Sequence, residues 1–419
     1  MAKRMKSIAL GIASAVLVLA MVLGSAIPVA QGEPAQKVVK IGMCGAFTGP
    51  IAPVAGPWNE GIVDYTRYIN EQGGIDGIKL EVIWYETGRS ITKSIIAHRR
   101  FLGAGVVLEH IGSTVADAMA TTFQRDEIPA TCLNALSPGQ ITKPMWIFNS
   151  FTDWPTAFTM TVKWIKENLW TEARPMRVGA IGYDHHSFWC GLDGTKYFDR
   201  VGAEFVGREV VPVAGCVDTS VELLRLAGKK VDWLYLTSYG ASTVTIIKDA
   251  ARLEIQQKGI GLVAAPNTLD ECTLVVVMKD ANGWYSGKIT PNPTETERLP
   301  GLVTLCEKAK EYRGYDVEKV KGFYIAGWLH QAAAVEAIRL AIEKVGYENL
   351  TGRAVREAMV SIRDFDTGFF YPMTITESAP FITTSFGMYQ VKEVNFEPIE
   401  YLEPLPSLYM TPEEFLRAL

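Results

Sequence analysis

Three short apolar runs decide the fold: KVVKIGM at 37–43, KLEVIWY at 79–85 and GVVLEHI at 105–111. Runs of this length that are rich in Val and Ile are typical of strands buried on both faces of a parallel sheet. Between the first two runs, apolar residues recur at helical spacing over 58–69, and the glycine pair that follows is a typical helix stop. The stretch therefore predicts strands that alternate with helices.

The same alternation continues to residue 264 and begins a second time with a helix over 155–169. The other expected elements are helices at 91–102, 115–126, 187–201, 219–228 and 241–253, and strands at 128–133, 145–149, 177–183, 204–212, 231–237 and 260–264. Because the pattern occurs twice, we expect an α/β protein with two doubly wound, Rossmann-like lobes. A single (β/α)8 barrel is the rival fold, but residues 367–400 read as strands without intervening helices.

Composition places the chain among ordinary globular proteins. Of its 419 residues, 48% are hydrophobic and 21% are charged. Lys and Arg number 41 and Asp and Glu number 46, which gives a net charge of −5. Nucleic-acid binders carry a positive surface, so we expect no nucleic-acid partner.

The first thirty residues have the pattern of a secretory signal peptide. A basic start precedes an uncharged run from Ile8 to Leu23, and small residues follow it. The alternative is an uncleaved anchor helix, although the run is shorter than the ~20 residues that span a bilayer. We expect cleavage after Ala26 or Ala30, which leaves a mature chain of net charge −8 in the periplasm or elsewhere outside the cytoplasm.

Neither the cysteines nor the histidines indicate a metal or catalytic site. The six cysteines are scattered singly, and we interpret them as buried apolar residues. Asp184-His185-His186 is a candidate for metal binding or acid–base chemistry, but the other histidines lie on other predicted elements. No nucleophile-elbow, zinc-protease or phosphate-loop motif occurs. We therefore expect a protein that is not an enzyme and has no metal or cofactor.

Ligands of open α/β sheets bind beyond the carboxyl ends of the strands. The candidate turns are 44–55, 86–89, 112–114, 134–137, 184–189, 238–240 and 265–270. Near these turns, Trp58 either contacts a ligand or anchors its helix in the core. His110 either contacts a ligand or is an ordinary buried histidine, and Arg89 either pairs with a ligand anion or is a solvated surface residue.

Several segments, in their order and spacing, resemble the type I periplasmic binding proteins, and more narrowly the leucine/isoleucine/valine-binding receptors of branched-chain amino acid ABC transporters. They are GAFTGPIAPVAGPWNEGIVDYTRYINEQGGIDGIKLEVIWYE at 45–86, IGSTVADAMA at 111–120, VGAIGYD at 178–184, LTSYGAS at 236–242 and GFYIAGWLHQAAAVEAI at 322–338.

This resemblance implies two lobes joined by a hinge of three crossovers, near 149–153, 280–290 and 361–368. The implied divisions are a signal peptide at 1–30, a first lobe of 31–149 plus 285–362, and a second lobe of 150–284 plus 363–419.

The resemblance also implies a ligand site. In the family, hydroxyls and backbone N–H groups of the first lobe hold a ligand carboxylate. The matching positions are Ser113, with Thr114 beside it, and the turn at Asn134 and Leu136, where Leu136 replaces a frequent hydroxyl residue. Plain capping of the helix start is the alternative role of Ser113 and Thr114.

In the second lobe, the family has aromatic lids and an acid for the ligand's ammonium group. Phe188 and Tyr239 match the lids. No carboxylate is in register at 265–267, although Asp270 or Glu271 could substitute if the loop shifts. Since an unpaired ammonium in a closed site is costly, an amide or an aromatic or aliphatic carboxylate is as well supported a ligand as an amino acid.

Together these features predict an exported receptor that binds a small molecule by hinge closure and delivers it to the permease subunits of an ABC importer. Ligand binding would shift the population from the open form to the closed form. A sensor of the same fold that feeds a signalling partner is one alternative. An exported hydrolase that uses His185 or His186 is another.

Overall fold

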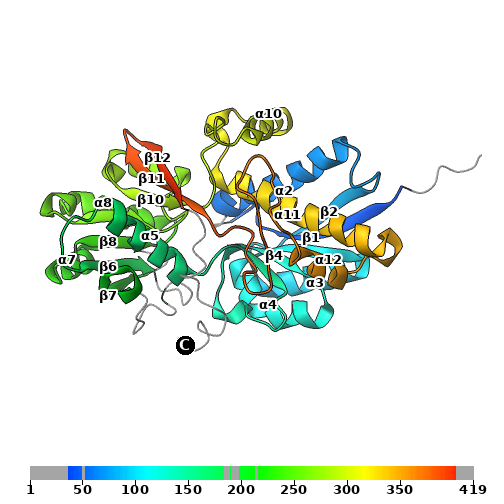
Figure 1. The fold of residues 1–419 in the computed structure, drawn as a ribbon, viewed down its shortest axis with the longest axis horizontal. Helices are drawn as coiled ribbons and strands as arrows, with labels where there is room; N and C mark the ends of the chain where they lie inside the picture. Colours follow the sequence, from blue (N-terminus) through cyan, green and yellow to red (C-terminus); the bar gives the residue numbers. More distant parts are fainter. Residues whose placement is uncertain (1–35, 50–51, 184–188, 190–197, 213–215, 403–419) are drawn as a thin grey trace, which may run out of the picture. The chain divides into compact units, whose positions relative to one another are not determined.

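The structure is a computed structural model that describes residues 36–49, 52–183, 189, 198–212 and 216–402 (Figure 1). The expected signal peptide, Asp184-His185-His186, Phe188 and most of the expected helix at 187–201 lie outside the described residues. Among the helices of the described ranges, none combines the length and the apolar character needed to cross a membrane.

The first sheet has five parallel strands in the order β2-β1-β3-β4-β5. They are β1 (Val38–Gly45), β2 (Lys79–Glu86), β3 (Val106–Gly112), β4 (Ala130–Ala135) and β5 (Ile147–Phe151). The helices that pack on this sheet or against one another beside it are α2 (Ala52–Glu71), α3 (Ile91–Ala104), α4 (Ser113–Asp126), α10 (Gly301–Arg313), α11 (Gly322–Val345) and α12 (Gly352–Met359).

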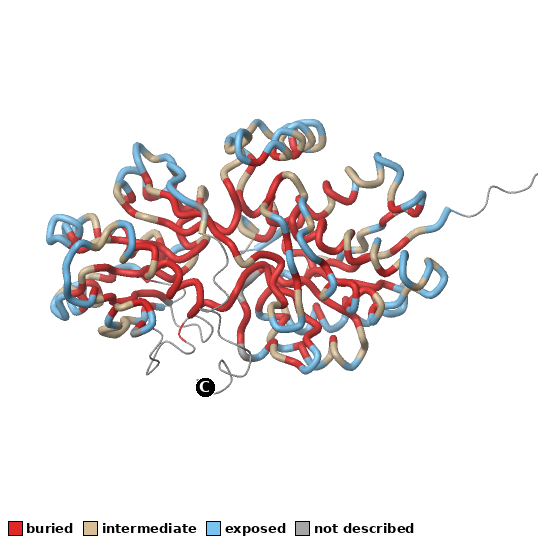
Figure 2. The backbone as a smooth tube through the Cα atoms, viewed as in Figure 1, coloured by how far each residue is buried: buried red, intermediate tan, exposed pale blue. Residues whose placement is uncertain are grey.

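Alternation along β1 shows how this sheet is covered. Val39, Ile41 and Met43 point to one face, where they join the core residues of α2 and α11. Cys44 points to the opposite face and packs with residues of α3 and α4. The strands are therefore buried on both faces, and the exposed residues gather on the outer sides of the helices (Figure 2).

The second sheet has seven strands in the order β12-β11-β10-β9-β8-β6-β7. Five are parallel: β6 (Met176–Tyr183), β7 (Ala203–Val211), β8 (Trp233–Thr237), β9 (Gly261–Ala264) and β10 (Tyr285–Lys288). The hairpin of β11 (Phe386–Lys392) and β12 (Asn395–Leu402) is added in antiparallel pairing. Helix α5 (Trp154–Asn168) packs on one face, and α7 (Ser220–Gly228), α8 (Ala241–Arg252) and α9 (Glu271–Val277) pack on the other.

Short 3-10 helices complete the described elements. They are Pro138–Gln140, Asp199–Val201, Gln256–Lys258, Met278–Ala281, Val317–Lys319 and Tyr347–Asn349.

The expectation of two mostly parallel sheets is confirmed, and the rival barrel is wrong because the strands form two separate sheets. The predicted strands differ from the observed ones by one or two residues at their ends. Strand β10 was missed, because its sequence YSGK has no apolar pattern and the strand exists through pairing with β9 and β11. Residues 367–385 contain no regular strand, and only β11 and β12 bear out the strands expected at 367–400.

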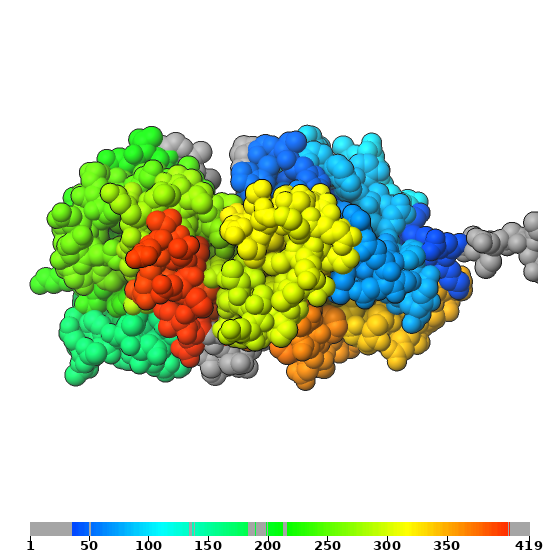
Figure 3. All heavy atoms as spheres, turned by 90° about the horizontal axis from the view of Figure 1, so that it is seen from above, coloured from blue at the N-terminus to red at the C-terminus, as the bar shows by residue number. Residues whose placement is uncertain are grey.

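The chain passes between the two sheets three times. It leaves the first sheet after β5, returns to helices of the first sheet after β10, and enters the second sheet again at β11. The apolar residues at 369–382 pack with α11 and α12, although the expected boundary at 362 assigns them to the other lobe. Helix α10 lies at the molecular surface after the second passage (yellow in Figure 3).

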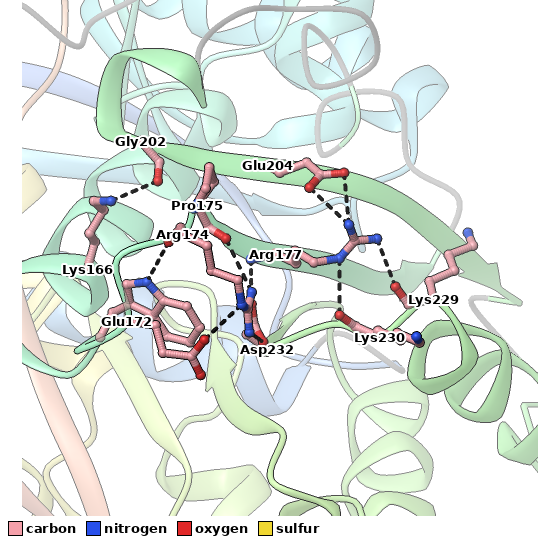
Figure 4. A network of polar contacts seen from close by, with 11 residues as sticks. Lys166, Glu172, Arg174, Pro175, Arg177, Gly202, Glu204, Lys229, Lys230 and Asp232 are labelled. Atoms are coloured by element: carbon pink, nitrogen blue, oxygen red, sulfur yellow. Dashed lines mark hydrogen bonds and ion pairs between the residues drawn. The ribbon is translucent and has the colours of Figure 1, made fainter.

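A polar network fixes the amino ends of two strands of the second sheet (Figure 4). Asp232, just before β8, accepts hydrogen bonds from both terminal nitrogens of Arg174 at 2.7 Å and from the backbone N–H of Arg177 at 2.8 Å. Arg177 also pairs with Glu204. These charges lie at the end of the sheet opposite to the carboxyl edge, so they stabilise the fold without entering the candidate site.

Candidate functional site

The turn after β2 holds Arg89 at the carboxyl edge of the first sheet. The backbone N–H groups of Thr87 and Gly88 donate to the carbonyl of Gly45, the last residue of β1, at 2.9 and 3.2 Å. Arg89 then takes a φ of 61°, which is uncommon for a residue with a side chain. Ser90 caps α3 directly after it. These hydrogen bonds hold the turn against the neighbouring strand β1, and they fix the backbone conformation from which the Arg89 side chain extends.

Arg89 lies against Gly112, the residue that precedes α4. A Cβ at position 112 would be 2.9 Å from Arg89 Nε and 3.2 Å from its Cγ and Cδ. Arg89 also acts on Cys132 of β4. Burial raises the pKa of this thiol and the negative charge of Asp117 raises it further, whereas the positive charge of Arg89 lowers it. The guanidinium group is therefore near the carboxyl ends of β3 and β4.

Ser113 is the first residue of α4 and is only 8% exposed, whereas Thr114 is exposed. The alternative role of helix capping is wrong for both, because Gly112 is the N-cap residue and no side chain of the described residues makes a cap hydrogen bond there. The first N–H groups of α4 consequently remain available to another acceptor. An uncapped helix start attracts anions through these donors and through the helix dipole.

The turn after β4 provides no ligand contact from the side chain of Leu136. The side chain of Leu136 is 1% exposed and packs with Met145 and Phe381, so it belongs to the core. Asn134 is in β4, and its side chain is not among those described. Any contact of Leu136 with a ligand must come from its backbone.

Trp58 and His110 are fully inside the first lobe. The ring nitrogens of His110 contact Thr131 Oγ1 and Gln331 Oε1, both at 2.6 Å. Trp58 packs edge-on against His110 and against His330 of α11, with ring centroids 6.1 and 5.4 Å apart. Burial lowers the pKa of His110 to about 4 and lowers that of His330 as well.

This buried polar cluster favours the core alternative for both residues. His330 and Gln331 were not among the candidate residues, yet they are polar residues within the most apolar of the described helices, and that contrast could have indicated the cluster.

In the second lobe, Tyr239 follows β8 and is half-buried, and its ring meets that of Trp154 edge-on at 6.2 Å. Its proposed partner lid, Phe188, lies outside the described residues. The structure thus places Tyr239 at a carboxyl end of the second sheet, and its role as a lid stays a prediction.

The two acids that might have replaced the missing carboxylate are both engaged. Asp270 caps α9 by accepting a hydrogen bond from the backbone N–H of Thr273 at 2.7 Å. Glu271 pairs with Lys288, which is 2% exposed. Burial by itself raises the pKa of Glu271, but the charge and hydrogen bond of Lys288 lower it overall, so this carboxylate remains ionised and paired.

A groove of about 570 Å³ lies between α2 and the edge strand β2, lined by residues such as Val63, Arg67 and Trp84. It runs along the outer edge of the sheet and includes neither Arg89 nor Ser113. Within the described ranges, no group of three or more His, Cys, Asp or Glu side chains is arranged to hold a metal ion.

Two doubly wound sheets linked by three passages, with polar turns at their carboxyl ends, define a type I periplasmic solute-binding fold. The family model for periplasmic binding proteins matches residues 38–395, and the chain belongs to that family.

Sequence relatives are distant. The chain is 23% identical over 284 residues to the Leu/Ile/Val-binding protein of Escherichia coli, covering 65% of this chain and 72% of that protein. It is 23% identical over 332 residues to the leucine-specific-binding protein of Salmonella typhimurium, covering 76% and 82%.

Solved structures agree on the fold. A branched-chain amino acid ABC transporter protein from Thermus thermophilus with bound valine superposes with a TM-score of 0.77 at 18% identity, covering 89% of this chain and 98% of that one. A solute-binding protein from Rhodopseudomonas palustris in complex with p-hydroxybenzoic acid gives 0.71 at 16% identity, covering 88% and 98%. The protein is therefore a member of the periplasmic binding protein family, and solved structures of the same fold hold ligands as different as valine and a hydroxybenzoate.

Proposed function

We propose that this protein is the extracytoplasmic receptor of an ABC importer and that it captures a small carboxylate or a related small molecule by hinge closure. The ligand binds first at the carboxyl edge of the first sheet, where Ser113 begins α4. The second lobe then closes over it, with Tyr239 and Phe188 as aromatic lids. The loaded, closed form is the one that the permease subunits recognise.

One observation supports this site above the others. Within the part of the chain that the structure describes, the start of α4 has no side-chain cap, and Ser113 there is buried beside Gly112. A helix start that leaves its N–H groups uncapped binds a carboxylate at low cost, because the donors are already oriented.

Hinge closure supplies the selectivity in this proposal. Closing the lobes removes water and strengthens each polar contact to the ligand. It also shifts the population between two forms, to the extent that the ligand contacts the closed form better than the open one. The three passages of the chain between the sheets are compatible with such a hinge.

A thermal-shift screen tests the proposal. The purified mature protein is heated with valine, leucine and isoleucine, their deaminated carboxylates, benzoate, 4-hydroxybenzoate and the matching amides. A ligand present at 100 times its dissociation constant adds about 2.7 kcal/mol to the free energy of unfolding, so a true ligand is readily seen. Absence of a shift with every member of this panel would contradict the proposed ligand range.

Ser113→Ala then locates the site. We expect it to weaken binding of the identified ligand by about tenfold or more, since a hydrogen bond to a charged oxygen is lost. Ser378→Ala, at an exposed position, is the control and should bind like the wild type. Equal affinity of Ser113→Ala and the control would remove Ser113 from the site.

A further inference from the structure

We propose that Glu271 forms an inter-lobe contact that favours the closed form: Lys288 holds its carboxylate in the second lobe, and the same carboxylate faces the start of α11 in the first lobe. This inference rests on the hinge closure of the proposed function and names residues that set its equilibrium. Glu271 is a positioning residue in this account, and no contact with a ligand is assigned to it.

Lys288 holds Glu271 through a buried ammonium group. Lys288 is the last residue of β10 and is 2% exposed. Its ammonium group contacts the carboxylate of Glu271 and the side-chain oxygen of Asn292, and it lies 5.1 and 4.7 Å from the ring centroids of Tyr389 and Phe396. An ammonium group away from water needs such partners, because it has lost its hydration. One oxygen of Glu271 is therefore fixed to the second lobe.

The other oxygen of Glu271 faces the first lobe. A Cβ at Gly322, the first residue of α11, would be 3.7 Å from Glu271 Oε2 and 2.5 Å from Thr290 Oγ1. Among the described residues, no side chain makes a cap hydrogen bond at this helix start. Burial raises the pKa of Glu271, but the positive charges of Lys288 and of Lys321, the N-cap residue of α11, lower it overall. An ionised carboxylate at an uncapped helix start is favourable, so this contact attracts one lobe to the other.

The contact joins the carboxyl edges of the two sheets. Glu271 begins α9, just after the turn that follows β9. Phe323, the second residue of α11, packs with Met43 and Leu133 near the carboxyl ends of β1 and β4. These two edges approach each other when lobes of this kind close. Closure therefore brings Glu271 to the start of α11, and opening separates them.

The second passage between the sheets, residues 289–300, is anchored beside this contact. The backbone N–H of Asn292 donates to Glu295 at 2.7 Å, and its side-chain amide donates to the Phe396 carbonyl at 3.2 Å. The Tyr389 hydroxyl donates to the same glutamate at 2.5 Å. The first residues of the passage are thus bound to the β11–β12 hairpin and move with the second lobe. A rotation of the lobes consequently changes the contact at the start of α11.

Single-molecule FRET on the mature protein without added ligand measures the closed fraction. The dyes are placed at Lys93 of α3 and Lys248 of α8, which are exposed and lie in different lobes. We expect Glu271→Gln to lower the ratio of closed to open molecules by about tenfold, since an ionic contact made in the closed form is lost. Glu297→Gln is the matched control, because it removes the same charge from an exposed position of the second passage and should leave the ratio unchanged.

A neutral double variant separates this role from simple stabilisation of the second lobe. Glu271→Gln alone leaves a buried ammonium without its carboxylate and should also lower the urea midpoint of unfolding. Adding Lys288→Met removes that charge, so the midpoint should recover while the closed fraction stays low. Recovery of the closed fraction together with the midpoint would show that the pair only stabilises its own lobe, and would overturn the inference.

Equal closed fractions in Glu271→Gln and Glu297→Gln would overturn the inference as well. No ligand enters this measurement, so its failure is distinct from a failure of the receptor function, which the thermal-shift screen tests by itself.

Discussion

Gly112 and Arg89 are in such close contact that a methyl group at position 112 would lie 2.9 Å from the Arg89 Nε atom. The neighbour that would have to move is the end of a flexible side chain rather than backbone. The backbone of Gly112 has φ −91° and ψ 162°, which an alanine adopts without strain. Substitution of Gly112 by alanine should therefore displace the Arg89 side chain while preserving the fold.

Gly112→Ala should weaken binding of a carboxylate ligand by about tenfold, with a loss of about 1 kcal/mol at most in stability from the altered cap. A double-mutant cycle checks the cause. In an Arg89→Gln background the same substitution should have little further effect on affinity. Additive effects of the two substitutions would show that Gly112 acts by a route other than Arg89.

The crossing of α2 and α11 depends on two glycines. A Cβ at Gly61 would be 2.2 Å from the Tyr324 carbonyl oxygen, and one at Gly327 would be 2.2 Å from that of Trp58. Because both obstacles are backbone atoms, Gly61→Ala should cost about 2 kcal/mol or more in the free energy of unfolding, measured by urea denaturation. Gly103→Ala is the control: no atom lies within 4 Å there, and the helix should become more stable by about 0.5–1 kcal/mol.

A partly buried ion pair joins α10 to α2. Arg313 forms two hydrogen bonds of 2.8 Å with Asp64, and the Tyr324 hydroxyl donates to the same carboxylate at 2.9 Å. Asp64→Ala should lower the free energy of unfolding by about 3 kcal/mol, because it leaves a partly buried guanidinium without a partner. Asp316→Ala removes only an exposed pair and should cost less than about 1 kcal/mol. Equal losses in both variants would contradict this account.

His110 should make the protein sensitive to acid. Its pKa is lowered from 6.5 to about 4 by burial, so the folded state binds its proton less readily than the unfolded state. The neutral His110 ring therefore contributes about 3 kcal/mol to the free energy of unfolding above pH 6.5. This contribution is lost as the pH falls toward 4. His110→Gln should show a smaller loss between pH 7 and 4.5 in denaturant titrations. A loss as steep as that of the wild type would assign the acid sensitivity to other groups.

His98 should act in the opposite direction. Burial by itself lowers its pKa, but contacts with Glu109 at 2.6 Å and Asp126 at 3.0 Å raise it overall. The protonated ring therefore stabilises the fold below pH 6.5, and this contribution disappears as the pH rises through the higher folded-state pKa. His98→Gln should be less stable at pH 6 and should show a flatter decline between pH 6.5 and 9. An unchanged alkaline slope would contradict this assignment.

Local patterns in the sequence were sufficient for most of the architecture. Strand β1 was readable because Val39, Ile41 and Met43 alternate with residues that pack on the other face. The end of α2 was readable from Gly73-Gly74, where Gly74 takes a φ of 80° and its N–H donates to the carbonyl of Ile69 at 2.9 Å. The position of the candidate turn at Ser113, directly after a strand, was likewise readable, since the carboxyl ends of parallel strands meet at one edge.

What the sequence alone determined, then, was most of the order of strands and helices, the two sheets and the edge at which a ligand is expected, because these follow from periodicity over a few residues. Only the tertiary structure decided that YSGK is a strand, that His110 is enclosed by Thr131 and Gln331, and that Arg89 lies across Gly112. Each of these depends on contacts between residues from different elements, some more than a hundred positions apart, and no local pattern encodes which partners the folded chain brings together.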